Sequence, residues 1–390
     1  MNGTFRKSYC TLLLFLACLL VLTACLPALP PEQYVYVLHV GVERGDELPY
    51  CVVLLVTQAK PGTGEESASK LQVLSAEARS LPEAVVVFSA GMPYQLNFSR
   101  VSLLVLSREL AESGEVLDVM DISFAKLNLS PHINMSVTES SMVELFEGML
   151  SESDPGLSKL TLNRRYHYER MGMTVNNSLT GLMESRQSRA FDMIYTLSNL
   201  DPNGARRDMV GGEVYPYLAG ALPAESVNKS ADMGTAVFSG EKMVGTLSGQ
   251  HTMLVLIGTG NFKSGRLLMP FGDDWAAIAL RPLGSPKIWL EGESASLSVR
   301  LEAELEKPSL MERCSQGELE RLIGEHVAIE MAHVFEAVQA ADSDVFGFGK
   351  TAIRQCGAIG EWQSGAWRQT YQKLHVSFLV EIRLKTETEN

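Results

Sequence analysis

The chain has 390 residues, of which 46% are hydrophobic and 20% are charged, which is typical of a globular protein rather than a disordered one. Its formal net charge of −13 and the lack of basic runs argue against binding to nucleic acid or to anionic lipid headgroups. With about 100–200 residues per domain, this length predicts two or three domains.

The first 24 residues have the order of a secretory signal peptide. Arg6 and Lys7 precede an uncharged apolar run at 12–22, which is too short to span a bilayer core of about 30 Å. The following Leu22-Thr23-Ala24-Cys25 resembles the lipobox of bacterial lipoproteins, in which the cysteine receives a diacylglyceryl group and the chain is cut before it. The alternative is an ordinary signal peptide that happens to end near a cysteine.

The lipobox resemblance implies that Cys25 becomes the first residue of the mature chain. Loss of Arg6 and Lys7 with the signal changes the net charge from −13 to −15. Acyl chains would hold that chain on the non-cytoplasmic face of a membrane. Beyond Cys25 no segment reaches the roughly 18 uninterrupted apolar residues that a spanning helix needs. We therefore expect a lipid-anchored protein that does not cross the bilayer.

Six cysteines are present, and Cys51, Cys314 and Cys356 are those that follow the lipobox. Their odd number and wide spacing match neither a disulfide framework nor a zinc site. A bridge between Cys314 and Cys356 is compatible with a location outside the cytoplasm, but buried or free thiols are the favoured interpretation.

The first half of the mature chain mixes strand and helix patterns. The mature chain begins with a proline-rich tether at 25–32. After it, β-branched and aromatic runs predict strands. Helices are predicted by apolar residues at helical spacing and, at 80–83, by a capping serine followed by a proline and a glutamate. The expected strands are 34–40, 50–57, 71–78, 101–106 and 133–137, and the expected helices are 80–90, 108–120 and 140–149. We predict an N-terminal α+β domain over 33–200, with a small middle domain from about 151 as an open alternative.

The pattern weakens between 151 and 230. The segment 191–197 is compatible with a helix, and turn-forming residues predict a linker at 201–230. Clear patterns return in a predicted C-terminal α+β domain over 231–390. The expected strands are 235–238, 242–245, 289–290, 295–305 and 375–384, and the expected helices are 316–341 and 367–374.

Two local patterns resemble binding motifs but favour structural roles. Gly347 and Gly349 follow a helix and lack the third glycine of a dinucleotide fingerprint, so we expect them to turn the chain while Phe346 and Phe348 anchor it. His326, Glu330 and His333 share one helical face, but their order is not the His-Glu-x-x-His of a zinc enzyme. We predict no metal site, no cofactor and no catalytic residue.

The C-terminal motifs resemble the Ger(x)C family, the lipoprotein C subunit of spore germinant receptors. The marks are Gly234 to Phe238, Met243 to Leu247, the long helix, and the segment Asp344-Val345-Phe346-Gly347-Phe348-Gly349 followed by Trp367 and a final strand. The resemblance implies a multi-domain α+β protein whose mixed or antiparallel sheets each pack against helices. Within the last motif it assigns structural roles to Asp344, Phe346, Gly347, Phe348 and Gly349.

The family resemblance also implies a function. The chain would be a non-catalytic subunit at the outer face of the cell membrane or spore inner membrane, assembled with a multi-spanning A subunit and an integral-membrane B subunit. A small nutrient germinant would be bound by the complex rather than by this subunit. A lipid-anchored solute-binding protein is the alternative, and a lipid-anchored hydrolase is a weaker one because no triad or metal signature is present.

Overall fold

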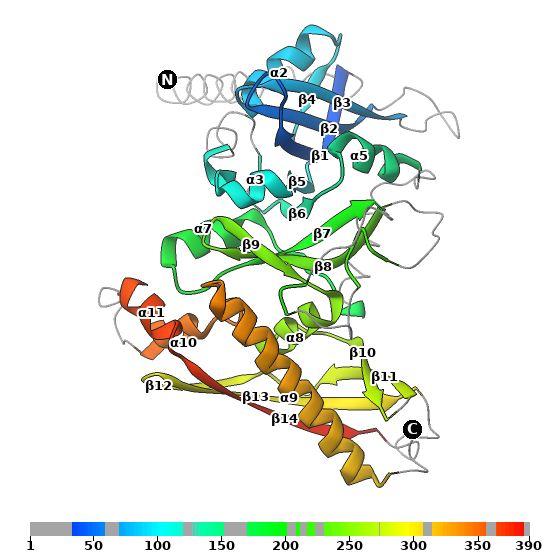
Figure 1. Ribbon diagram of the computed structural model, residues 1–390. Coiled ribbons are helices and arrows are strands. Elements are labelled where there is room, and N and C mark those ends of the chain that lie inside the picture. The colour runs from blue at the N-terminus through cyan, green and yellow to red at the C-terminus, as the bar shows by residue number, and fades with distance from the viewer. Residues whose placement is uncertain are drawn as a thin grey trace, which may run out of the picture.

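The computed structural model describes residues 33–58, 70–119, 127, 129–130, 132–151, 170–200, 208–210, 217–222, 230–272, 274–306, 314–355 and 364–385. These residues form two β-sheets, each packed against helices, which confirms the predicted α+β class (Figure 1). Among the helices in these ranges, none combines the length and the apolar character needed to cross a bilayer.

The first sheet has nine strands in the order β3-β2-β1-β5-β6-β7-β8-β9, with β4 also paired to β1. Its centre is parallel from β1 through β7, and antiparallel pairs extend it on both sides. The strands are β1 Tyr34–Arg44, β2 Tyr50–Gln58, β3 Lys70–Ala78, β4 Gln95–Asn97, β5 Leu103–Ser107, β6 Asn134–Thr138, β7 Ile194–Leu200, β8 Ser230–Ser239 and β9 Lys242–Leu247.

Helices cover both faces of this sheet. On one face α2 (Leu81–Ala90), α3 (Arg108–Ser113) and α7 (Leu179–Ser188) contribute to one large apolar core. On the other face α5 (Met142–Ser151) packs its buried residues against alternate side chains of β2 and β5. Because the central strands are buried on both sides, they read as continuous apolar runs rather than alternating ones.

The second sheet has the strand order β10-β11-β13-β12, and β14 runs parallel to β13. The strands are β10 Gly265–Phe271, β11 Asp274–Pro282, β12 Lys287–Glu291, β13 Ser294–Leu305 and β14 His375–Leu384. The helices of this half are α8 Gly249–Thr259, α9 Gln316–Ala340, α10 Phe348–Gln355 and α11 Ser364–Tyr371. The long helix α9 lies across the sheet, with its apolar stripe in the core (Figure 1).

The helix α9 also covers strand β14. A Cβ atom at Gly324 of α9 would lie only 2.9 Å from the carbonyl oxygen of Val380, so the glycine allows the helix backbone to approach the strand. Further along, the Glu320 side chain accepts a hydrogen bond from the backbone N–H of Leu384 at 2.9 Å. The helix thereby satisfies one backbone N–H of this strand, which would otherwise be available for pairing with another chain.

Most predicted elements are present, and α9 ends one residue before the predicted end of the helix at 316–341. The helix predicted at 191–197 is wrong, because this segment enters β7, whose side chains are almost all buried. The helix predicted over 108–120 is interrupted. Helix α3 stops at Ser113 because Gly114 adopts a left-handed conformation with φ of 82°, and the chain is helical again at 116–119.

Candidate functional site

The Asp344 carboxylate caps the N-terminus of α10. Its Oδ1 accepts hydrogen bonds from the backbone N–H groups of Gly347 and Phe348 at 2.9 Å, and its Oδ2 accepts one from Gly349 at 2.8 Å. The first N–H groups of a helix have no partner within the helix, so a carboxylate there is stabilising. Burial and the nearby Asp192 charge raise the pKa of Asp344 to about 7, although the N–H donors oppose this shift.

The other residues of the predicted family motif lie in the core of the C-terminal half. Phe346 and Phe348 are buried, and each packs against Phe335 of α9 with ring centroids 6.3 and 5.6 Å apart. Between them Gly347 has a φ of 75°, a backbone conformation that a residue with a side chain rarely adopts. The motif is therefore a turn whose two rings hold it to α9.

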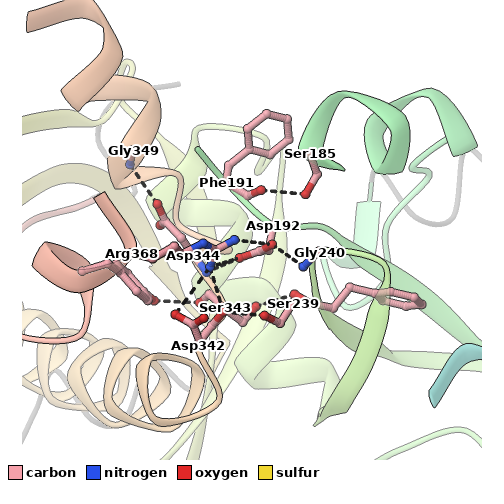
Figure 2. Close-up of polar contacts among 12 residues, drawn as sticks. Ser185, Phe191, Asp192, Ser239, Gly240, Asp342, Ser343, Asp344, Gly349 and Arg368 are labelled. Atoms are coloured by element: carbon pink, nitrogen blue, oxygen red, sulfur yellow. Dashed lines mark hydrogen bonds and ion pairs between the residues drawn. The ribbon is translucent and has the colours of Figure 1, made fainter. Parts of the chain in front are cut away.

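Asp192, in the segment between α7 and β7, joins this turn to two other parts of the chain (Figure 2). Its Oδ2 accepts a hydrogen bond from the backbone N–H of Asp344 at 2.8 Å, and its own N–H donates to the Asp344 carbonyl at 3.0 Å. Its Oδ1 accepts a hydrogen bond from Gly240, in the turn between β8 and β9, at 2.7 Å. The side chain of Asp192 is fully buried.

Arg368 of α11 supplies the positive charge opposite Asp192. Its Nη1 and Nη2 lie 2.7 and 2.9 Å from the two carboxylate oxygens, which is the bidentate geometry that favours arginine over lysine. Nη1 also donates to the carbonyl oxygen of Asp342 at 2.8 Å. Burial acts to lower the pKa of Arg368, but the hydrogen bonds and charge of Asp192 outweigh it and raise the pKa.

Hydroxyl groups complete the contacts around this pair (Figure 2). Ser343 donates to the Phe238 carbonyl at 2.6 Å, Ser239 donates to the Asp342 carbonyl at 2.7 Å, and Tyr371 donates to the Ser343 carbonyl at 2.7 Å. These bonds hold the turn after α9 between the β8–β9 hairpin and α11. We call the following residues the junction cluster: Asp192, Ser239, Gly240, Asp342, Ser343, Asp344 and Arg368.

The polar groups of the junction cluster bind one another and the backbone, which is the pattern of a structural cluster. Asp192 and Arg368 neutralise each other, and the remaining carboxylate oxygens accept backbone hydrogen bonds. A catalytic acid or base must instead reach a substrate proton. The cluster therefore fixes three distant segments against one another, and removal of the Arg368 or Asp192 side chain would leave its partner's buried charge uncompensated.

A second buried charge cluster lies between α8 and α9. The Nδ1 atom of His251 is 2.5 Å from Asp208 Oδ2, and its Nε2 is 3.6 Å from Glu330 Oε2, which is an ion-pair distance rather than a hydrogen bond. Burial alone would lower the pKa of His251, but these two carboxylates raise it to about 9. The Asp208 carboxylate also accepts a hydrogen bond from Ser248, the N-cap of α8, at 2.8 Å.

The structure gives the predicted helical face of His326, Glu330 and His333 a different role from metal binding. Glu330 faces the buried His251, and its other oxygen lies 3.5 Å from His333 Nδ1. His326 is half-buried at the edge of the core, and burial lowers its pKa. Within the described ranges, no group of three or more His, Cys, Asp or Glu residues is placed to hold a metal ion.

The cysteines contribute little to these sites. Cys25, the predicted lipidation residue, and Cys356 lie outside the described residues. Cys51 and Cys314 are half-buried free thiols. Burial and nearby carboxylates raise the pKa of Cys51 to about 11, so this thiol is a poor nucleophile at neutral pH. The sequence favours free or buried thiols over a Cys314–Cys356 bridge, and the bridge, as the alternative, involves a residue outside the described ranges.

A cavity of about 260 Å³ opens beside the junction cluster. Both halves of the chain line it, through α7 and β7 on one side and α8 and the Asp344 turn on the other. Its polar and charged residues are Asn177, Glu184, Asp192, Thr259, Asn261 and Lys350. The Lys350 ammonium group lies 3.6 Å from the centroid of the Phe191 ring, a cation–π contact.

Sequence reasoning missed Asp192, Arg368, Asp208 and His251. The signal available for Asp192 was a single charge between Phe191 and Met193, in a run that is otherwise apolar. Such a charge is expensive to bury unless it is paired, so it predicts a partner without saying where that partner lies. The partner, Arg368, follows 176 residues later.

The chain is a multi-domain α+β protein whose two halves are joined by buried polar contacts, and the comparisons give its family. The family model described as "Spore germination protein N-terminal domain" matches residues 29–191, and "Spore germination B3/ GerAC like, C-terminal" matches residues 233–387. The chain therefore belongs to the Ger(x)C family of spore germination proteins, the C subunits of germinant receptors.

A solved structure supports the same fold. The "Crystal Structure of the GerBC protein" aligns with a TM-score of 0.51 over 89% of this chain and 97% of that chain. The sequence identity is 10%, so the likeness concerns the fold alone. No curated protein matches the chain in a sequence search.

Proposed function

We propose that this chain is a lipid-anchored, non-catalytic subunit of a spore germinant receptor, needed for the response to nutrients. The observation that carries the proposal is the match of both halves, in order, to the two germination-family models. The subunit would act at the outer face of the spore inner membrane. There it would assemble with a multi-spanning A subunit and an integral-membrane B subunit.

The lipid anchor is supported by the sequence Leu22-Thr23-Ala24-Cys25 after an apolar run. Attached acyl chains would hold the acidic mature chain at a membrane that does not attract it electrostatically. A non-catalytic role is supported by the junction cluster, whose buried charges are committed to one another and to backbone groups. A rigid connection between the two halves suits a subunit whose role is to bind other subunits of a complex.

The test is a Cys25→Ala substitution in the spore-forming host. We expect the variant protein to leave the membrane fraction and the spores to lose their nutrient response. A Cys51→Ala variant is the matched control, because this half-buried thiol lies on strand β2 and not in the lipobox. Normal retention and normal germination of Cys25→Ala spores would overturn the proposal. Purification of the tagged chain from solubilised spore membrane should also recover the two membrane subunits.

A second candidate function is capture of a small solute by this subunit itself. The cavity beside the junction cluster favours it, because Lys350, Glu184 and two amide side chains surround a space of about 260 Å³. This is below the roughly 300–1,000 Å³ of typical ligand pockets, so it suits only a small polar molecule. Calorimetry of the purified chain with amino acids and sugars tests this candidate, and no heat at millimolar ligand would reject it.

A further inference from the structure

The solvent side of α2 and of the loop after it exposes several apolar residues, and its charges are the Arg79–Glu83 ion pair at the start of the helix. Helix α2 buries Leu81, Ala84 and Phe88, which leaves its opposite side to solvent. On that side Val86 is 69% exposed and Val87 is 49% exposed, and Tyr94 in the following loop is 37% exposed. We call the exposed apolar residues here the α2 face: Val86, Val87, Pro93 and Tyr94.

The α2 face is unusual in a chain with this charge. The mature chain would carry −15, yet no charged residue lies between Glu83 and Arg100 in the sequence. Exposed apolar residues that occur singly need no explanation, but an adjacent group without charges is typical of an interaction site. Unpaired negative charge elsewhere on the chain is repelled by anionic headgroups, whereas the acid nearest the α2 face, Glu83, is paired with Arg79, so this surface can approach a bilayer.

The predicted anchor lies close to this surface along the chain. Strand β1 begins at Tyr34, which pairs with Gln95 of β4, and Gln95 directly follows Tyr94 of the α2 face. Nine residue steps separate Cys25 from Tyr34, so a fully extended chain reaches about 30 Å at most. Figure 1 shows α2 and β4 near one end of the molecule and the α9–β14 layer near the other.

Aromatic side chains flank the point where the tether joins the fold. The rings of Tyr34 and Tyr36 lie 6.1 Å apart, and the Arg100 guanidinium lies 4.1 Å from the centroid of the Tyr36 ring. Tyrosine has an apolar ring and a polar tip, and it is enriched at the level of lipid headgroups. Arginine can place its charge there while its stem stays on apolar surface.

We propose that the α2 face rests on the phospholipid bilayer and fixes the orientation of the chain relative to the membrane. The proposal rests on lipidation of Cys25, which brings this end of the molecule within reach of the bilayer. The lipid attaches the chain to the membrane, and the α2 face determines which end of the molecule faces the bilayer. The second sheet, at the other end, is then held away from the lipid (Figure 1).

The test uses brominated lipids, which quench indole fluorescence on contact. The chain has 4 Trp residues, at positions 275, 289, 362 and 367, all in the C-terminal half. A Val87→Trp substitution therefore adds an indole at the α2 face, where the native residue is half exposed. Met183→Trp on α7 is the matched control, because Met183 is also exposed, at 38%, and lies outside the α2 face.

The full chain, purified from membranes with its lipid, is reconstituted into phosphatidylcholine vesicles with and without bromine on the acyl chains. We expect bromine to remove most of the emission added by Val87→Trp, but not the emission added by Met183→Trp. Introducing Val86→Asp into the Val87→Trp chain should restore the emission, because a carboxylate resists entry into the membrane. Unchanged melting temperatures confirm that the variants fold.

Two failures are distinguishable in this experiment. If the chain floats with the vesicles but bromine leaves the Val87→Trp emission intact, the α2 face does not touch lipid, and the inference is overturned alone. Bromine could instead quench the Val87→Trp emission in the chain alone but no longer quench it after a membrane subunit is added. That result would show that a protein partner covers the α2 face and would likewise overturn the inference. If the chain does not float with vesicles at all, the lipid anchor is wrong, and this inference falls with it.

Discussion

The Arg368 guanidinium forms a two-pronged ion pair with the buried Asp192 carboxylate, at 2.7 and 2.9 Å, across 176 residues of sequence. Asp192 directly follows the last residue that matches the N-terminal family model, which covers 29–191, and Arg368 lies within the part that matches the C-terminal one. The pair therefore connects the two halves of a germination protein directly. Its contribution to stability can be measured by removing one partner.

Arg368→Ala should lower the free energy of unfolding by about 3–5 kcal/mol, because it leaves the Asp192 carboxylate buried without a counter-charge. Arg368→Lys should cost less but still destabilise, since an ammonium group cannot bind both oxygens in the same plane. Urea unfolding followed by circular dichroism measures both. Arg354→Ala on α10 is the control, because this exposed side chain should change stability by no more than about 0.5 kcal/mol.

Asp344→Asn should destabilise the chain by about 1–3 kcal/mol, because one side-chain oxygen becomes an NH₂ donor facing a backbone N–H and leaves it without an acceptor. Asp342→Asn is the matched control two residues earlier. Its side chain is half exposed, and its φ of 53° is one that asparagine tolerates well. Equal losses in the two variants would contradict the capping role of Asp344.

The His251 cluster predicts a pH dependence. Because the folded-state pKa of His251 is raised to about 9, its charged form stabilises the fold fully below the unfolded value of about 6.5. This contribution, on the order of 3 kcal/mol, is lost as pH rises from about 6.5 to 9. Asp208 and Glu330 have lowered pKa values, so they lose their stabilising charge only in acid.

The measurement is the unfolding free energy of wild type and of His251→Gln between pH 6.5 and 9. We expect the wild type to lose stability over this range and the variant to be less stable at pH 6.5 but nearly flat. His333→Gln should keep the wild-type slope, since His333 is 51% exposed. The same slope in His251→Gln as in wild type would show that another group titrates.

Gly349→Ala tests the close contact at the start of α10. A Cβ atom there would lie 2.1 Å from the Ala190 carbonyl oxygen and 2.5 Å from Trp367 Nε1, so the two halves would have to separate. We expect a loss of about 1–3 kcal/mol in thermal or chemical unfolding, as for other overpacked sites. Gly317→Ala in the first turn of α9 meets no atom within 4 Å and should stabilise by up to about 1 kcal/mol.

Elements with a one-sided pattern were predictable from the sequence. The α9 stripe of Leu319, Ile323, Val327, Met331 and Val334 repeats at three- and four-residue steps, so the helix could be placed almost to the residue. Helix α8 was missed because nearly all of its residues are buried, which leaves no stripe to detect. Strand β7 was misread as a helix for the same reason, since its core position gives it no alternation.

In the candidate site, too, only the residues that form a local sequence pattern were predictable. The turn from Asp344 to Gly349 was recognisable because its residues are adjacent and its glycines mark a special backbone. The lipobox at Cys25 is likewise a contiguous pattern, and the anchor it implies stays a prediction. By itself, then, the sequence determined the family, the class of fold and most of the elements.

Only the tertiary structure decided which charges meet. Asp192 and Arg368 pair, and His251 lies between Asp208 and Glu330, because the order of the strands brings segments together that are far apart in the chain. It also placed β4, which directly follows Tyr94 of the α2 face, beside the strand that follows the predicted tether. Local patterns reflect interactions between residues close in sequence, whereas these contacts depend on how whole elements pack, so no spacing rule reveals them.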